Sequence, residues 1–415
     1  MPDNTVSLSL TGSVPTPEIF GQYFQQYVIE ASTNLVDWFP LVTLQQTNQP
    51  TTALTFQDKA AAQSDRGFYR THTNHFMTPL PQPIGPYAVG TFSRLLTDPS
   101  RTNAARGTNR QMMLTAWYPA SSRTGLPSAL FEMPQLAQDE IFWGRFVDRM
   151  PSFVSHSILN AAVSTNQMKY PVVLYAHGVN SYRFDNIDKT EELASQGYIV
   201  IALDHRDSIS VLPDGSIVNG LGPVTDMVAT INDRVLDFQL ILEELARLSD
   251  SESLLAGHLD LEHVGAFGFL IGGSTAAELC RVDPRCKVGA NIEGGFFVPA
   301  IRELGLPKPF LILRADAPDG DRKDVYEKLA TDAYWVKVGK TIRWNFNLNG
   351  LVFEPTEMSR LGAPPPEEQT SGVRTSQITR AYLVAFFNKY LKNQDDHLLD
   401  GPSADYPEVM EFLKK

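Results

Sequence analysis

Two glycines, Gly268 and Gly272, carry the spacing with the clearest meaning for catalysis. They flank a short turn between the apolar run 264–269 and a segment rich in alanine and other small residues. This pattern predicts a tight strand-to-helix turn, called the elbow below. Such a turn lifts one side chain above a sheet and commonly presents a nucleophilic Ser, Cys or Asp. The residue at the apex is Leu270. A leucine side chain has no proton to lose and no lone pair, so it cannot attack a carbonyl carbon.

Strands that alternate with helices must hold this turn in place. The alternation begins near Tyr87 and predicts a mainly parallel sheet with helices on both faces. The predicted strands are residues 111–118, 170–176, 198–204, 263–269, 287–292, 309–314 and 333–338, and the predicted helices are 188–196, 224–248 and 375–390. Apolar residues recur at helical spacing in 224–248, so we expect its Asp and Arg residues to face solvent or to pair locally.

The loop after strand 170–176 begins with His177-Gly178-Val179. We expect the backbone N–H groups of Val179 and Ile271 to form an oxyanion hole, and His177 to support the loop through hydrogen bonds. After the next strand, His205-Arg206-Asp207 is interpreted as a polar cluster that shapes the floor of a pocket.

Four segments together resemble the α/β-hydrolases of the platelet-activating-factor acetylhydrolase (plasma/isoform II) type, which include bacterial esterase relatives. They are residues 170–178, 193–207, the elbow around Leu270, and 340–346. The resemblance extends over about residues 84–412. It implies hydrolysis of short or oxidised acyl esters by a Ser-acid-His triad, without metal or cofactor.

Placed on this sequence, the resemblance puts the nucleophile at Leu270, the acid at Glu293 and the base at Arg343. Arg343 cannot accept a proton because its guanidinium stays protonated. No histidine lies between residues 264 and 396. Only the acid therefore remains, and we expect Glu293 and Arg343 to form a salt bridge where the acid and the base would pair.

Other residues could be considered for the missing roles. Ser274 lies one helical turn past the apex, where we expect its hydroxyl to bond to a carbonyl group. Asp316 could act as a relocated acid, but an acid without nucleophile and base is idle. His397 follows the last helix in a polar tail and is a poor base candidate.

Three interpretations remain open. The chain is a hydrolase-fold protein that has lost ester hydrolysis, with Leu270 filling the acyl pocket. Alternatively, it is an enzyme of non-nucleophilic chemistry that uses Glu293, or a binding or scaffold protein. In each case we expect a small ester or lipid-like ligand in an apolar pocket, and no cofactor or metal.

The remaining sequence suggests a modular chain. Residues 1–77 alternate short β-type runs with turns, which predicts a small β-sandwich, and residues 30–38, 56–58 and 67–70 resemble a fibronectin-like accessory module. A Pro-rich linker (78–86) and the hydrolase domain (87–415) follow. The apolar insertion at 129–165 is either a set of helices that cover the sheet or a lid over a pocket.

Composition excludes some classes of partner and leaves others open. The net charge of −12 argues against binding to nucleic acid or to anionic lipid, and no apolar run is long enough to span a membrane. Cys280 and Cys286 are either two free buried thiols or a local disulfide, and a metal site is disfavoured. We expect a bacterial exported protein, periplasmic or extracellular, although the first residues carry no signal-peptide pattern.

Overall fold

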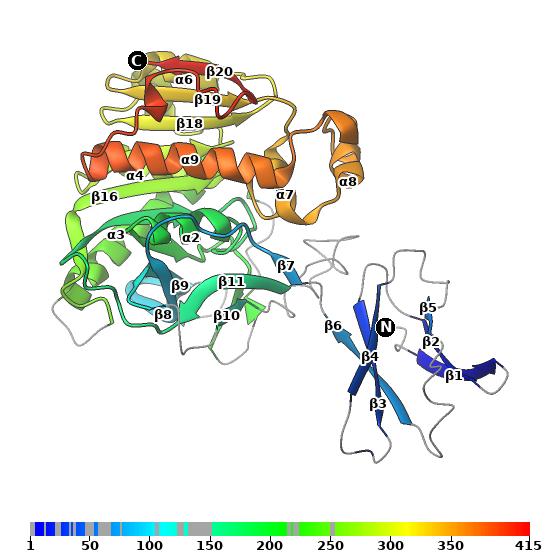
Figure 1. Cartoon of the computed structure of the whole chain (residues 1–415). Helices are drawn as coiled ribbons and strands as arrows, with labels where there is room; N and C mark the ends of the chain where they lie inside the picture. Colours follow the sequence, from blue (N-terminus) through cyan, green and yellow to red (C-terminus); the bar gives the residue numbers. More distant parts are fainter. Residues whose placement is uncertain are drawn as a thin grey trace. The chain divides into compact units, whose positions relative to one another are not determined.

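The structure is a computed structural model of the whole chain (Figure 1). It describes residues 5–415 except 12–13, 21–25, 33–34, 36–38, 46–53, 57–67, 75–76, 104–107, 123–127, 132–151, 214–216, 219–223 and 250–253. The chain divides into two compact units. One comprises residues 1–79 with 130–154, and the other comprises residues 80–129 with 155–415.

A twisted mixed sheet organises the larger unit, with the strand order β11-β8-β9-β13-β12-β16-β17-β18-β19-β20. From β13 to β19 neighbouring strands are parallel, and the pairs β8–β9, β9–β13 and β19–β20 are antiparallel. The strands are β8 (Ala88–Asn103), β9 (Thr108–Ala120), β11 (Ser152–Leu159), β12 (Tyr170–Ala176), β13 (Ile199–Leu203), β16 (Leu259–Phe269), β17 (Cys286–Ile292), β18 (Phe310–Ala315), β19 (Ala333–Val338) and β20 (Val409–Lys414).

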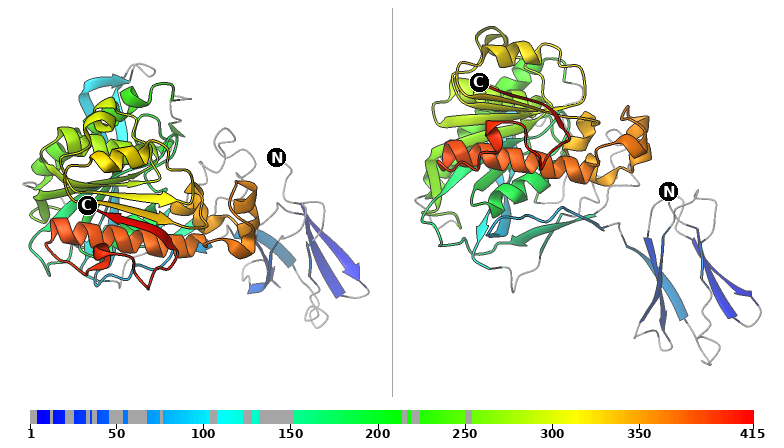
Figure 2. Two further views of the ribbon diagram at one scale, coloured as in Figure 1. Left: turned by 90° about the horizontal axis from the view of Figure 1, so that it is seen from above. Right: turned by 45° about the horizontal axis from the view of Figure 1, so that its top comes forward.

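Helices cover both faces of this sheet (Figures 1 and 2). The helices are α2 (Ile187–Ser195), α3 (Met227–Ser249), α4 (Ile271–Val282), α5 (Pro299–Leu304), α6 (Arg322–Lys328), α7 (Asn349–Val352), α8 (Pro355–Arg360) and α9 (Gly372–Leu391). Three short 3-10 helices are η4 (Arg343–Phe346), η5 (Pro366–Glu368) and η6 (Leu398–Asp400), and a small hairpin joins β14 (Ser210–Val211) to β15 (Ile217–Val218).

The elbow strand β16 shows how the two faces are used. Val264 and Ala266 belong to the hydrophobic cluster that also contains buried residues of α3 and α4. Gly265, on the opposite face, lies so close to α9 that a Cβ atom there would be 2.7 Å from the ring of Phe387. Because successive side chains of a strand point to opposite faces, β16 is covered by α3 and α4 on one side and by α9 on the other.

The fold predicted for the larger unit, a mainly parallel sheet with helices on both faces, is confirmed. Helix 375–390 extends by a few residues at its start, and the elbow strand begins at Leu259 rather than at residue 263. Strands β8, β11 and β20 were not predicted, because each pairs at or near an edge of the sheet and lacks a continuous apolar run. No helix in the described ranges is long and apolar enough to cross a membrane.

The N-terminal strands form two small antiparallel sheets. One has the order β1-β2-β5 and the other β4-β3-β6. Their bounds are β1 (Thr5–Thr11), β2 (Val14–Phe20), β3 (Gln26–Ser32), β4 (Phe39–Gln45), β5 (Leu54–Thr55) and β6 (Phe68–Asn74), followed by β7 (Met77–Pro79). Trp38, Asp58 and Gly67, on which the fibronectin-like resemblance partly rests, lie outside the described residues. That resemblance and the domain limits drawn from the sequence stay predictions.

The insertion expected at 129–165 lies largely outside the described residues, which omit 132–151. Strands stand at its two ends, β10 (Ser128–Phe131) and β11. The lid and the helical cover therefore both stay predictions.

Both cysteines are free and buried, Cys280 on α4 and Cys286 on β17. Burial raises the pKa of the Cys280 thiol, and the neighbouring Cys286 raises it further.

Candidate active site at the elbow

Leu270 occupies a sharp turn between β16 and α4. Its backbone angles are φ 53° and ψ −119°, a region that residues with a side chain rarely adopt. Its N–H donates to the carbonyl of Ile292 over 2.9 Å, and its own carbonyl accepts from Gly273 over 3.0 Å. Backbone strain of this kind costs about 1–3 kcal/mol and is typical of functional turns. The elbow geometry is therefore present with leucine at its apex.

The two flanking glycines are required by close contacts. A Cβ atom on Gly268 would lie 2.2 Å from the backbone of Gly272, and one on Gly272 would lie 2.0 Å from the carbonyl oxygen of Ala176. No side chain fits in either space. These contacts bring the start of α4 directly against the end of β12, where the loop His177-Gly178-Val179 begins.

The Leu270 side chain lies against this loop. Its Cδ1 atom is 3.6 Å from the position that a Cβ atom on Gly178 would take. Ile271 is the first residue of α4, where a backbone N–H has no partner within the helix. The N–H of Val179 has no hydrogen-bond partner in the described part of the chain. Both amides are thus free to bind an anionic oxygen, and the oxyanion hole itself stays a prediction.

Glu293 follows β17 and is almost completely buried. Its Oε1 atom lies 2.8 Å from Nη1 of Arg314 and accepts a hydrogen bond of 2.5 Å from the backbone N–H of Ala315. The expected salt bridge between Glu293 and Arg343 is therefore wrong. Strands β17 and β18 are paired so that Ile292 faces Leu313, and this register places Glu293 beside Arg314 at the ends of neighbouring strands.

Arg343 begins η4 and is exposed. No hydrogen bond or ion pair joins it to another described residue. The loop that carries it is nevertheless well anchored: the Asn345 side chain accepts from the N–H of Ile342 over 2.8 Å, and the buried Lys189 ammonium donates to the carbonyl of Phe346 over 2.9 Å. Hydrogen bonds therefore fix the backbone of this loop, while the Arg343 guanidinium has no partner among the described residues.

The other candidates have structural partners. The Ser274 hydroxyl donates to the carbonyl of Gly295, which confirms the expectation that it bonds to a carbonyl group. The exposed Asp316 accepts from the N–H of Lys340 over 3.0 Å. His397 is exposed and lies 2.8 Å from a carboxylate oxygen of Asp400. None of these contacts joins them to the elbow.

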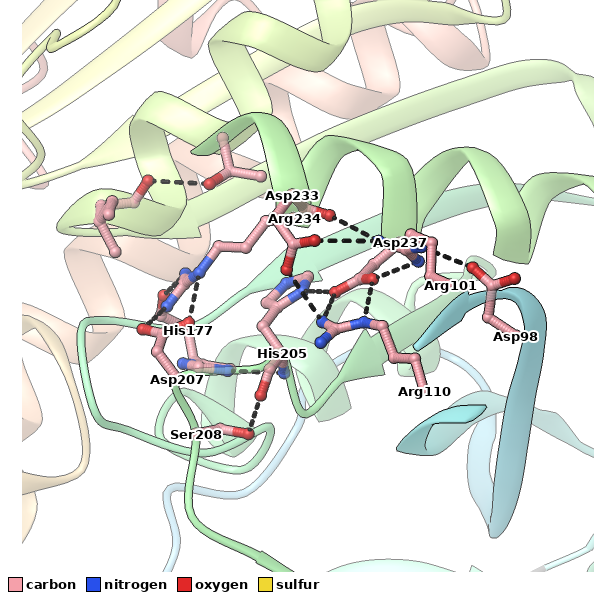
Figure 3. A network of polar contacts seen from close by, with 12 residues as sticks. Asp98, Arg101, Arg110, His177, His205, Asp207, Ser208, Asp233, Arg234 and Asp237 are labelled. Atoms are coloured by element: carbon pink, nitrogen blue, oxygen red, sulfur yellow. Dashed lines mark hydrogen bonds and ion pairs between the residues drawn. The ribbon is translucent and has the colours of Figure 1, made fainter. Parts of the chain in front are cut away.

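A buried polar network supports the loop after β12 (Figure 3). The guanidinium of Arg234, on α3, donates to the carbonyls of His177 and Gly178 over 2.6 and 3.0 Å. It also forms a two-point ion pair with Asp207, at 3.0 and 2.5 Å. Burial alone would raise the pKa of Asp207, but Arg234 outweighs it and holds this pKa well below its usual value.

A second buried carboxylate, Asp237, lies one helical turn along α3 (Figure 3). It accepts from both sides of the Arg110 guanidinium at 2.9 and 2.5 Å, from Arg101 at 2.6 Å, and contacts Nδ1 of His205 at 2.9 Å. Burial acts to raise its pKa, but His205 and Arg110 together hold it well below its usual value. The expectation that the charged residues of this helix face solvent is wrong for Arg234 and Asp237, because their partners come from distant strands and loops.

The two histidines of this network are neutral supports. Nδ1 of His177 lies 2.6 Å from the carbonyl oxygen of Gly178, and its Nε2 accepts from the N–H of His205 over 3.2 Å. Burial lowers the pKa of both imidazoles, and the charge of Arg234 lowers them further. The interpretation of His177 as a support of its loop is confirmed. Of the predicted polar cluster, His205 and Asp207 are buried in the network and Arg206 is exposed.

Asp185 holds the same loop from the other side. Its Oδ2 atom accepts from the N–H of Gly178 over 3.3 Å and from the Ser181 hydroxyl over 2.7 Å, and its Oδ1 accepts from the Tyr175 hydroxyl. Sequence reasoning missed both Asp185 and Arg234. The sequence signal that could have identified them is the presence of charged residues in segments that are otherwise apolar, which suggests buried ion pairs.

Comparison with known proteins agrees with this geometry. Residues 73–213 match the family described as platelet-activating factor acetylhydrolase, isoform II. A probable 1-alkyl-2-acetylglycerophosphocholine esterase of Arthroderma benhamiae is 24% identical over 378 residues, which cover 80% of this chain and 93% of the relative. The larger unit has the fold of an α/β-hydrolase, and residues 73–213 resemble the platelet-activating factor acetylhydrolase isoform II family.

Two further proteins are similar to this chain. The platelet-activating factor acetylhydrolase of Cavia porcellus is 23% identical over 282 residues, which cover 58% of this chain and 61% of the relative. The solved structure of a ferulic acid esterase from Streptomyces cinnamoneus has a TM-score of 0.66 and 27% identity, and covers 81% of this chain and 99% of that chain. The family match contains the loop after β12 but ends before the elbow, so it does not decide which residues perform chemistry here.

Proposed function

We propose that this chain is a member of an ester-hydrolase family that no longer hydrolyses esters by the serine mechanism and instead keeps the fold and its ester- or lipid-binding site. The observation that carries the proposal is the residue at the elbow. Leu270 adopts the strained backbone of a nucleophile position, yet its side chain offers no nucleophile. A strain of about 1–3 kcal/mol without a chemical benefit fits a site inherited from a catalytic ancestor.

The surroundings of the elbow support the same proposal. The position of the base carries Arg343, whose guanidinium cannot accept a proton. The Leu270 side chain packs against Gly178, so it also reduces the space in which a tetrahedral intermediate would form. The supports of the loop, Asp185 and Arg234, are all in place. The frame is intact, and the groups that perform the reaction are missing.

The alternative in which Glu293 acts alone as a general base is less well supported. Its Oε1 atom is already bound by Arg314 and by the backbone N–H of Ala315. These two contacts use both lone pairs of this oxygen, so Oε1 has none left for a hydrogen bond from a catalytic water.

The test is a set of three proteins assayed with short acyl esters of p-nitrophenol. They are the wild type, the double variant Leu270→Ser with Arg343→His, and the matched control Leu270→Ala with Arg343→His, which opens the same space without a hydroxyl group. We expect no turnover above buffer for the wild type and the control, and measurable turnover for the serine variant. Wild-type turnover that Glu293→Gln abolishes would overturn the proposal and favour the alternative.

A further inference from the structure

Three arginines lie on elements that meet at the carboxyl-terminal edge of the sheet, near Glu293. Arg314 is the last residue but one of β18 and contacts Glu293. Arg322 begins α6, and its Nε donates to the carbonyl of Gly294 over 2.9 Å. Arg343 begins η4, which packs against β18. Burial lowers the pKa of Arg314, the charge of Glu293 acts to raise it, and the charges of Arg322 and Arg343 lower it further. Both of these guanidiniums therefore act on Arg314.

The acids nearby do not balance this cluster. Glu293 is shared with the N–H of Ala315. Asp319, whose charge also reaches Arg314, lies 3.0 Å from the ammonium of Lys337. The buried Nε of Arg314 has no hydrogen-bond partner, and Arg343 contacts no other charged group among the described residues. Among the described residues Arg322 and Arg343 thus form no ion pair, and Asp316, the other acid at this edge, accepts from the N–H of Lys340.

An unbalanced group of guanidiniums at a partly buried edge favours the binding of an anion. Arginine binds carboxylates and phosphates through two parallel hydrogen bonds, and this pairing is strongest where water is partly excluded. Ligands of open α/β sheets also bind outside the carboxyl ends of the strands, which is where these three residues lie.

The cluster adjoins the elbow. Gly294, which accepts from Arg322, lies so close to the turn that a Cβ atom there would be 2.3 Å from the carbonyl oxygen of Leu270. Apolar side chains are available at the same turn: Leu270 is partly exposed, and Phe297, whose N–H donates to the Ser274 hydroxyl over 3.4 Å, is 38% exposed. A positive cluster beside apolar side chains suits an anion with an apolar part better than an inorganic ion.

We propose that Arg322 and Arg343 bind the carboxylate of an organic acid. The buried Arg314 adds positive charge, and the apolar part of the ligand contacts Leu270. This inference deepens the proposed function and rests on it, because it names the ligand class of the same site. The ligand has the chemistry of the acid half of an ester. The chain would therefore retain a carboxylic acid where its relatives cleave an ester.

The test is titration calorimetry of the full chain at pH 7 with sodium octanoate, with its neutral analogue octanamide, and with inorganic phosphate. We expect octanoate to bind and octanamide to bind at least tenfold more weakly, since a charge-assisted hydrogen bond contributes about 1.5–3 kcal/mol. Arg343→Gln should weaken octanoate binding by about tenfold or more. Arg343 is exposed, so this substitution should leave the fold intact, which a thermal melt checks.

The matched control is Arg360→Gln, which removes an exposed guanidinium from α8 and should leave octanoate binding unchanged. Equal binding of octanoate and octanamide, or unchanged binding in Arg343→Gln, would overturn the inference. Phosphate binding that is as tight as octanoate binding would overturn the choice of an organic acid. A wild-type protein that hydrolyses esters and also binds octanoate would overturn the proposed function alone, whereas one that does neither would overturn this inference alone.

Discussion

The carboxylate of Glu293 and the guanidinium of Arg314 meet at 2.8 Å, with side chains only 4% and 1% exposed. A buried ion pair adds little stability compared with apolar residues, but removal of one partner leaves the other charge uncompensated. The pair therefore serves as a sensitive probe of how the edge of the sheet is held.

We expect Glu293→Gln to lower the free energy of unfolding by about 3 kcal/mol, because it leaves Arg314 buried with no anion. Urea unfolding followed by circular dichroism measures the change. Glu303→Gln, at an exposed position on the nearby α5, is the control and should shift the free energy by less than about 0.5 kcal/mol. Equal effects of the two substitutions would contradict the described pairing.

The support of the loop after β12 by Arg234 can be tested on the same helix. Arg234→Met removes the hydrogen bonds to the His177 and Gly178 carbonyls and leaves Asp207 without its cation. We expect a loss of about 3–5 kcal/mol in the free energy of unfolding. The control is Arg247→Met, since the Arg247 side chain is 72% exposed and pairs with Glu244 on the same helix. Hydrogen exchange of the backbone amides near Gly178 should accelerate only in the first variant.

Substitutions of Leu270 measure the backbone strain at the elbow. At an ordinary helical position glycine is less favourable than alanine by about 1 kcal/mol. At the elbow the order should invert, because only glycine adopts a φ of 53° without strain. We expect Leu270→Gly to be more stable than Leu270→Ala by about 1 kcal/mol in urea unfolding. The pair Leu236→Gly and Leu236→Ala, at a half-exposed position on α3, should show the ordinary order.

The buried histidines predict a pH dependence. Because burial lowers the folded-state pKa of His177 and His205, the unfolded chain binds more protons than the folded chain below about pH 6.5. The stability from these groups is present above that pH and is lost as the pH falls. We expect His205→Gln to reduce the slope of unfolding free energy against pH by up to about 1.4 kcal/mol per unit between pH 6.5 and 4.5.

The contribution of His205 is isolated by the difference in slope between the wild type and His205→Gln. Burial raises the folded-state pKa of Asp185 and Glu191, so they contribute with the opposite sign in the same range. The lowered pKa of Asp237 means that its contribution is lost only below about pH 3.9, outside the range. His263→Gln, at an exposed position, should keep the wild-type slope. A slope in His205→Gln equal to that of the wild type would contradict the buried neutral imidazole.

The two cysteines predict a thiol count. Both are free and buried, and the raised pKa of Cys280 keeps its thiol protonated. We expect negligible reaction of the native protein with a thiol reagent and two thiols after unfolding in urea, because the thiolate is the reactive species. A count of zero in urea without reductant would instead show the local disulfide.

Sequence reasoning predicted what depends on local pattern and residue type. The alternation of strands and helices and the two glycines around Leu270 follow from hydrophobic periodicity and from close backbone approach. The expectation that positions 270 and 343 lack a nucleophile and a base rests only on the identity of two side chains. The strands β8 and β20 were missed, because a partly exposed strand carries little apolar signal.

Pairing between charged groups could be decided only by the tertiary structure. Glu293 binds Arg314 rather than Arg343 because the register of β17 and β18 brings their ends together. Arg234 and Asp237 are buried because their partners arrive from segments that are remote in sequence, such as Arg110 on β9. A charged residue within a helical pattern is expected to face solvent, because the sequence does not show which distant residue pairs with it. The sequence by itself determined the alternating frame and the residue at its sharp turn, and only the folded chain decided which charges are paired.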